Sequence, residues 1–275
     1  MKKVLPRGMA LVAVLWIVAA LSVMALALAG TARVQVRTAS VQRDAATAQA
    51  AGEAAAALAL QELLAQPALP DAGHATVVHW QGMDIAVHIT PLNGYIGLNS
   101  ASAELLAAVL QSAGAGNAQA LAEAIVAWRD GTDMPPGERR QLRRFEAVED
   151  LMLVPGMDYA LYARIASLLS VDAAGGAVNA RGAPADVLRA LAGGQDARVD
   201  EYMARRDQPD SDASFLAFAG THVGAGALYR VHVGISLTEG TIAHFECDVA
   251  LRADMQRRLP WVVLRQSWRI AAPQP

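Results

Sequence analysis

The stretch that decides the class of this chain is MALVAVLWIVAALSVMALALAG, residues 9–30, which contains no charged side chain. A helix of this length would extend roughly 33 Å at about 1.5 Å of rise per residue, enough to cross the hydrocarbon core of a bilayer. The preceding residues, MKKVLPRG, contain the basic side chains Lys2, Lys3 and Arg7. Basic residues hold such a tail in the cytoplasm, so we expect the body of the protein on the outer side of the membrane.

Three interpretations of this N-terminus remain open. A secretory signal peptide has a shorter apolar region, about 7–15 residues, before an A-x-A-like cleavage site, although ALALA (25–29) fits such a site. A plain signal anchor is the second interpretation. In the third, Arg7-Gly8-Met9 resembles a prepilin processing site. Cleavage then follows Gly8, Met9 becomes the new N-terminus, and the membrane helix is kept and packs the subunits together.

Composition and motifs give no evidence for an enzyme. The net charge is -3, so the whole-chain charge gives no case for a nucleic-acid partner. The sequence contains no G-x-S-x-G, H-E-x-x-H or P-loop motif. The single cysteine, Cys247, excludes an intramolecular disulfide, and strand alternation places it on an apolar face. We therefore expect no catalytic and no cofactor-binding residue.

The pattern of elements predicts sheet strands on both sides of a helical block. Ala and Gln favour a continuation of the first helix to about Gln66, where Pro67 and Pro70 end it. Alternating apolar residues predict the strands 76–80, 85–89, 229–237, 243–251 and 261–270, with turns at 81–84 and 239–240. Apolar-faced segments predict the helices 102–111, 117–129, 145–153, 159–169 and 183–191.

This order predicts an α+β protein in which a sheet is interrupted by a helical insertion. Antiparallel strands can pair across a long insertion at little entropic cost. The strand histidines, which lack zinc-like spacing, are expected on the sheet surface: His79, His88, His232 and His244.

Two stretches of the helical block echo each other. GLNSA (97–101) precedes ELL (104–106), and AVNA (177–180) precedes DVL (186–188). We expect the Asn or Ser of each stretch to cap the helix that follows.

The order of these segments carries a family resemblance. GLN (97–99), AWRD (127–130), DL…VPGM (150–157) and VNA…VL (178–188) resemble, in that order, the inserted helical domain of minor pseudopilins of type II secretion systems, most closely the GspK type. The resemblance extends from Arg7-Gly8 to the C-terminal strands. It implies a pilin-like long N-terminal helix packed on an antiparallel sheet, with a large inserted all-helical domain.

The resemblance also implies an arrangement of domains along the chain. A prepilin leader, a transmembrane helix, a periplasmic helix with the first strands, an inserted helical domain and the remaining strands correspond to residues 1–8, 9–30, 31–92, 93–212 and 213–275. The protein would be a single-pass component of the inner membrane with its body in the periplasm.

The implied function is assembly rather than catalysis. Most prepilins have Glu at the fifth mature position, where this chain has Ala13. GspK-type subunits lack that Glu, which implies a place at the pseudopilus tip. The implied partners are the I-type and J-type minor pseudopilins, the major pseudopilin, the prepilin peptidase and the inner-membrane assembly platform. The pseudopilus would serve the export of folded proteins across the outer membrane.

A calcium site is a further implication of the resemblance. The candidate ligands are Asp130, Asp133 and Glu138, because alternate carboxylates around a Gly turn suit a cation that takes six to eight oxygen ligands. The chain departs from the family pattern at Ala127, where an Asp is usual, and in the basic residues after Glu138. An acidic solvated turn therefore remains the alternative.

A different function is suggested by LxxVPG (151–156). This segment followed by a helix also resembles helix-hairpin-helix modules, whose hairpin amides hold DNA phosphates. A membrane-anchored periplasmic DNA receptor is therefore the alternative function. Against it, Asp158 is an unfavourable charge beside a phosphate, and the nearby arginines at 139–140 and 143–144 are expected on a solvated helix face.

Overall fold

The computed structural model describes residues 7–132, 143–208, 211–216, 218–220, 227–237, 241–254, 256 and 258–271. The chain divides into two compact units, Met1–Ala51 and Gly52–Pro275. Helix α1, Arg7–Leu64, begins in the first unit and ends in the second, within two residues of the predicted end. Pro67 and Pro70 follow it and are incompatible with its continuation.

The predicted membrane span lies in the first unit. Residues 11–24 are exposed in the isolated chain, among them Leu15 and Trp16 at 69% and 73%. Side chains of residues 9–10 and 25–30 lie outside the described part. Among the helices of the described residues, none combines the length and apolar content that a membrane crossing requires. The span 9–30 thus stays a prediction.

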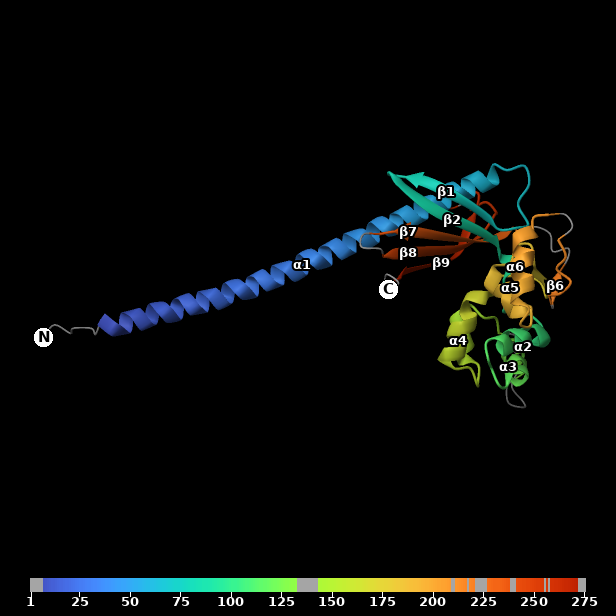
Figure 1. The fold of residues 1–275 in the computed structure, drawn as a ribbon, viewed down its shortest axis with the longest axis horizontal. Coiled ribbons are helices and arrows are strands. Elements are labelled where there is room, and N and C mark those ends of the chain that lie inside the picture. Colours follow the sequence, from blue (N-terminus) through green and yellow to red (C-terminus); the bar gives the residue numbers. More distant parts are fainter. Residues whose placement is uncertain are drawn as a thin grey trace. The chain divides into compact units, whose positions relative to one another are not determined.

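The centre of the second unit is a five-stranded antiparallel sheet with the order β1-β2-β7-β8-β9 (Figure 1). Its strands begin and end close to the predicted bounds: His74–Trp80, Met83–Pro91, Leu228–Ser236, Ile242–Ala250 and Val262–Ala271. The predicted mixture of helices and antiparallel strands is confirmed. The predicted turn 239–240 lies outside the described residues.

The first hairpin is closed by a two-residue turn. Gln81 and Gly82 have φ values of 47° and 79°, so both central residues are left-handed. This conformation matches the right-handed twist of the flanking strands. Strand β2 then pairs with β7 although more than a hundred residues separate them, with Val87 opposite Val233.

The end of α1 covers one face of the sheet. Of the residues of α1 that belong to the second unit, the following small and branched ones are buried: Ala55, Ala56, Ala59, Leu60 and Leu63. The apolar face of the strands is buried too, including Val87, Val233 and Phe245. Gly52 permits the close approach, since a Cβ there would lie 2.8 Å from the Phe245 Cβ and 3.2 Å from the Ile235 Cδ1.

This contact yields a prediction for Gly52→Val. We expect the substitution to lower the free energy of unfolding by about 1–3 kcal/mol, because the new atoms overlap the base of the Phe245 side chain, which cannot swing away. Urea unfolding followed by tryptophan fluorescence measures the change. Ala57→Val, at a half-exposed position of the same helix, is the control. It should lower the free energy of unfolding by only a few tenths of a kcal/mol, roughly the difference in helix propensity. Equal losses in both variants would contradict close packing at Gly52.

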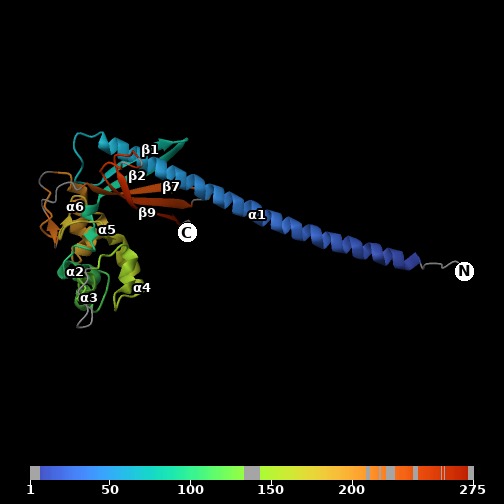
Figure 2. The same cartoon turned by 180° about the vertical axis from the view of Figure 1, so that it is seen from behind.

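The insertion between β2 and β7 is rich in helix and has its own core. Its α-helices α2 to α6 are Ala103–Ser112, Ala118–Asp130, Tyr159–Ile165, Ala185–Leu191 and Asp196–Arg205. Its 3₁₀ helices η1 to η3 are Leu92–Gly94, Val148–Leu153 and Ala166–Leu168. Figures 1 and 2 show the α-helices gathered at one end of the sheet. Their apolar faces, with Phe145, Leu105 and Val187, form one buried cluster.

The insertion differs from the prediction in three respects. It is not all-helical, because β3 (Ile96–Gly97) pairs in parallel with β4 (Leu169–Ser170), and β5 (Val178–Asn179) with β6 (Ala219–Gly220). The helix expected at 145–153 is the shorter η2, and the one expected at 159–169 is divided into α4, η3 and β4. Helix α6 was not predicted. The predicted domain limits 93 and 212 stay predictions, since sheet and insertion belong to the same compact unit.

Candidate functional site

The candidate processing residues stand at the start of α1. Gly8 and Met9 belong to the first turn of the helix, and the side chain of Met9 lies outside the described part. Ala13, the residue at the position of the usual Glu, is exposed on the same helix. Cleavage after Gly8 remains a prediction.

Of the candidate calcium ligands, the structure describes Asp130 alone. It is the last residue of α3, and the left-handed Gly131 that follows (φ 65°) ends the helix. The Asp130 carboxylate accepts a hydrogen bond from Arg129 Nε at 3.2 Å. Asp133 and Glu138 lie outside the described residues.

The described residues alone do not complete a calcium site. A single carboxylate beside a guanidinium cannot supply six to eight oxygens. Within the described ranges, no group of three or more His, Cys, Asp or Glu side chains could hold a metal. The calcium prediction therefore stays untested at its other ligands.

The echoed Asn residues do not cap helices, contrary to the prediction. Ser102 caps α2 by accepting from the Leu105 amide at 3.3 Å, and Pro184 precedes α5. Asn179 Nδ2 instead donates to the Asp71 carbonyl at 2.8 Å and to Asn93 Oδ1 at 3.1 Å. The side-chain amide of each Asn therefore donates hydrogen bonds to segments far away in the chain. A rule about local helix capping cannot predict such contacts.

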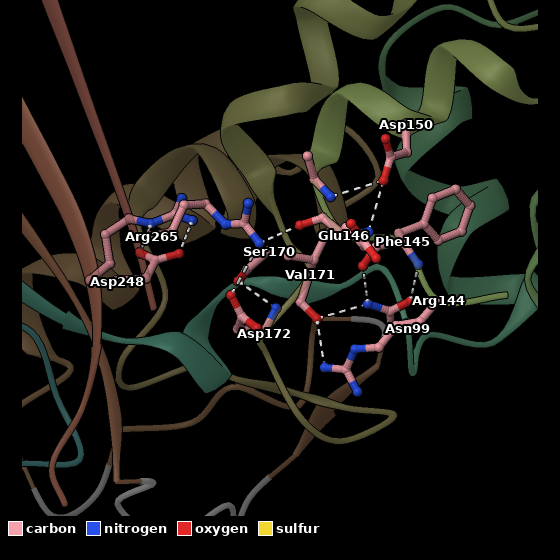
Figure 3. A network of polar contacts seen from close by, with 12 residues as sticks. Asn99, Arg144, Phe145, Glu146, Asp150, Ser170, Val171, Asp172, Asp248 and Arg265 are labelled. Atoms are coloured by element: carbon pink, nitrogen blue, oxygen red, sulfur yellow. Dashed lines mark hydrogen bonds and ion pairs between the residues drawn. The ribbon is translucent and has the colours of Figure 1, made fainter. Parts of the chain in front are cut away.

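Asn99 joins three segments of the insertion. Its Nδ2 donates to the carbonyls of Phe145 at 3.0 Å and Val171 at 2.9 Å, and its Oδ1 accepts from the Phe145 amide at 2.9 Å. Figure 3 shows these bonds as part of a larger polar network. Phe145 is fully buried and stacks on Trp128 with ring centroids 4.3 Å apart.

The network continues to the outer face of the sheet. Arg265 of β9 donates through Nη2 to the Glu146 carbonyl, and the same nitrogen lies 3.6 Å from Asp172 Oδ2 (Figure 3). The insertion therefore contacts part of the sheet face that α1 does not cover. We call this polar contact zone the joint, defined by Tyr95, Glu146, Asp172, Arg230, Asp248 and Arg265.

A buried ion pair lies inside the joint. Arg230 of β7 donates from Nε to Asp248 Oδ1 at 2.7 Å and from Nη2 to Oδ2 at 2.9 Å. The residues are 7% and 2% exposed. The Tyr95 ring of the insertion lies 4.4 Å from the guanidinium carbon. Burial alone would lower the pKa of Arg230, but the hydrogen bonds and charge of Asp248 raise it, so the charged form is held.

A histidine pair lines a cleft beside the ion pair. The cleft has a volume of about 480 Å³ and lies between β7–β9 and the α4–α5 region. His232 Nε2 lies 3.3 Å from His244 Nδ1, with the rings edge to face. Both stand in strands as predicted, but His232 is largely covered. Burial lowers its pKa to about 4, and His244, His88, Arg269 and Arg230 add to the shift.

The shifted pKa predicts a loss of stability in mild acid. The unfolded chain protonates His232 near pH 6.5, whereas the folded chain does so near pH 4. The unfolded state thus binds more protons between these values, and stability falls as pH drops from 6.5 to 4. Urea midpoints across pH 4–8 should show this slope reduced in His232→Gln. His79→Gln, an exposed histidine of β1, is the control. An unchanged slope in His232→Gln would refute the assignment.

In the hairpin that resembles a DNA-binding module, the side chain of Asp158 caps the N-terminus of α4. Gly156 has a φ of 92° between η2 and α4, as such a hairpin requires. Asp158 Oδ1 accepts from the Leu161 amide at 2.7 Å, so the carboxylate itself occupies the helix N-terminus. A phosphate would meet a negative charge there. The DNA-receptor alternative therefore gains no support from the structure.

The other residues considered for chemistry have structural roles. Cys247 is buried, and burial raises the pKa of its thiol to about 12, which opposes a nucleophilic role. The solvated helix face expected for the arginines is wrong at 143 and 144, which lie in an irregular segment. The Arg143 guanidinium stacks on Trp128, 5.5 Å from the ring centroid. Arg139 and Arg140 lie outside the described residues.

Of the comparisons with known proteins, the one with solved structures gives a match. No protein-family model and no curated protein sequence matches the chain. A matching solved structure is the crystal structure of the GspK-GspI-GspJ complex from the enterotoxigenic Escherichia coli Type 2 Secretion System. The identity is 16%, the match covers 86% of this chain and 99% of the other chain, and the TM-score is 0.49.

Proposed function

We propose that this chain is a minor pseudopilin of a type II secretion system and acts as the GspK-type subunit at the pseudopilus tip. The observation that carries the proposal is the order of parts. A long first helix precedes an antiparallel sheet, and a helix-rich insertion interrupts that sheet between β2 and β7. The sequence motifs of the insertion resemble the same class of protein in the same order.

In this proposal the function is binding and assembly. Residues 9–30 hold the protein in the inner membrane, and the body lies in the periplasm. The long helix packs against those of the I-type and J-type minor pseudopilins. The trio initiates a pseudopilus of major pseudopilin on the inner-membrane assembly platform, and the insertion caps it. The pseudopilus serves the export of folded proteins.

N-terminal mass analysis with and without a prepilin peptidase tests the proposal. The peptidase should remove residues 1–8 and leave Met9 at the terminus. Gly8→Leu should block the removal, while Ala13→Ser, beyond the cleavage site, should leave it intact. Cleavage near residue 30, or an unchanged mass, would overturn the proposal. Co-purification of the processed chain with I-type and J-type subunits then tests the place at the tip.

A further inference from the structure

Two histidines in the cleft between the sheet and the insertion are spaced as two ligands of one metal ion would be. His232 Nε2 of β7 lies 3.3 Å from His244 Nδ1 of β8, and both residues line the cleft. Bonds from zinc to imidazole nitrogen measure about 2.0–2.1 Å, so two nitrogens at a tetrahedral angle around one ion lie roughly 3.3 Å apart. The pair therefore requires little movement to chelate an ion.

The sheet holds both imidazoles on one face. His232 lies directly opposite Glu246 in the register of β7 with β8, and His244 precedes Glu246 by two residues on β8. Because side chains alternate between the two faces along a strand, all three project from the face that contacts the insertion. The strands that carry the histidines are hydrogen-bonded to each other, so binding an ion would order little additional backbone.

The His232 ring is in the form that binds metal. Neutral imidazole is the ligand, and burial keeps this ring neutral at pH 7 by lowering its pKa to about 4. Its Nδ1 is buried and has no hydrogen-bond partner within the described part of the chain. A buried polar atom without a partner requires an explanation, and the hydrogen bonds of this ring do not account for its place in the cleft.

The charges around the cleft do not exclude a cation. Arginines and carboxylates are equal in number in its lining, which contains Arg230, Arg265, Arg269, Glu149, Asp186 and Glu246. Arg230 is paired with Asp248, and Arg265 Nη2 lies 3.6 Å from Asp172 Oδ2. Arg269 is exposed, where water and salt screen its charge. With the ion-pair partners included, among them Arg189 beside Asp186, five carboxylates face four guanidinium groups.

We propose that His232 and His244 chelate a divalent transition-metal ion of the zinc or copper class, and that water completes its coordination. Imidazole suits these ions, whereas calcium and magnesium take oxygen ligands. The described residues contain no group of three or more metal-binding side chains, so the ion keeps open positions. The site lies on the sheet, whereas the candidate calcium ligand Asp130 ends α3. It does not depend on the proposed function.

Zinc titration of the full chain tests the site. The protein is purified in nonionic detergent without a polyhistidine tag, and calorimetric titration at pH 7 is run in excess calcium, which occupies oxygen sites. We expect one ion per chain, with affinity about tenfold weaker or more in His232→Gln and in His244→Gln, because each variant lacks one of the two ligands. His79→Gln, an exposed histidine of β1, should bind like the unchanged chain.

Electron paramagnetic resonance of bound Cu²⁺ reads the ligands directly. The spectrum of the unchanged chain should show coupling to two imidazole nitrogens, and that coupling should be reduced in each cleft variant. Zinc should also raise the urea midpoint of the unchanged chain and not that of either cleft variant, because it binds the folded state alone.

Three outcomes would overturn the proposal: no binding in excess zinc, equal affinity in the unchanged chain and both cleft variants, or displacement of zinc by calcium. Urea unfolding without zinc verifies that each variant folds. Cleavage by the prepilin peptidase, which does not involve this cleft, reports separately on the proposed function.

Discussion

Replacing Asp248 by alanine is expected to lower the free energy of unfolding by about 3–5 kcal/mol, because it leaves the buried charge of Arg230 without its partner. The pair is bidentate, with donor–acceptor distances of 2.7 and 2.9 Å. Glu246 also forms an ion pair with Arg230, 3.6 Å from Nε, but its side chain is 36% exposed, so it compensates for the lost bidentate partner only in part. Urea unfolding at pH 7 measures the loss.

The double variant Arg230→Met/Asp248→Leu separates the charge from the packing. The double variant replaces both charges by apolar side chains beneath Tyr95. Most of the free energy of unfolding that Asp248→Ala loses should therefore return. Glu201→Ala is the matched surface control, because its ion pair with Arg205 is 64% exposed on both sides and is worth about 0–1 kcal/mol. A double variant as unstable as Asp248→Ala would show that the joint depends on packing by these side chains and not on charge compensation.

The sheet could be predicted from the sequence because its signal is local. Alternation with a period of two residues placed Val231 and Cys247 on the apolar face and Arg230 and Asp248 on the polar face, and the register confirms both. What alternation could not reveal is that the insertion covers the part of that polar face around Arg230 and Asp248. The joint requires contacts between segments far apart in the chain, such as Glu146 with Arg265. Arg230 and Asp248 therefore have the sequence pattern of exposed residues, although they are buried.

Within the insertion, local rules succeeded or failed according to how much apolar surface an element buries. Helix α2 buries four residues on one face, and its periodicity was clear. Helix α6 buries only Val199 and Tyr202 in a polar segment, DARVDEYMAR, so it gave too weak a pattern. The short parallel strands β3 to β6 have two residues each and no periodicity to detect.

Asn99 is the residue for which the local and the tertiary interpretations predict different results. As a helix cap, it could be replaced by Asp at no cost, because a carboxylate accepts from the same amides. In the structure its Nδ2 is a donor to two carbonyls, of Phe145 and Val171. Asn99→Asp removes both donations and places a negative charge against two oxygens, so we expect a loss of about 3 kcal/mol or more, at about 1–3 kcal/mol for each unsatisfied partner.

The control for Asn99→Asp is Asn117→Asp, at the exposed N-cap of α3, where the side chain makes no capping hydrogen bond. There the new charge lies at a helix N-terminus and should be neutral or slightly stabilising. Urea unfolding compares the two variants, and tryptophan fluorescence reports on Trp128, which stacks on Phe145. If Asn99→Asp is as stable as the unchanged chain, Asn99 does not bridge the segments at 99, 145 and 171. If Asn99→Asp unfolds at a lower urea concentration than the unchanged chain and Asn117→Asp does not, Asn99 links distant segments of the insertion. Its position in the repeated motif is then explained by tertiary packing and not by helix capping.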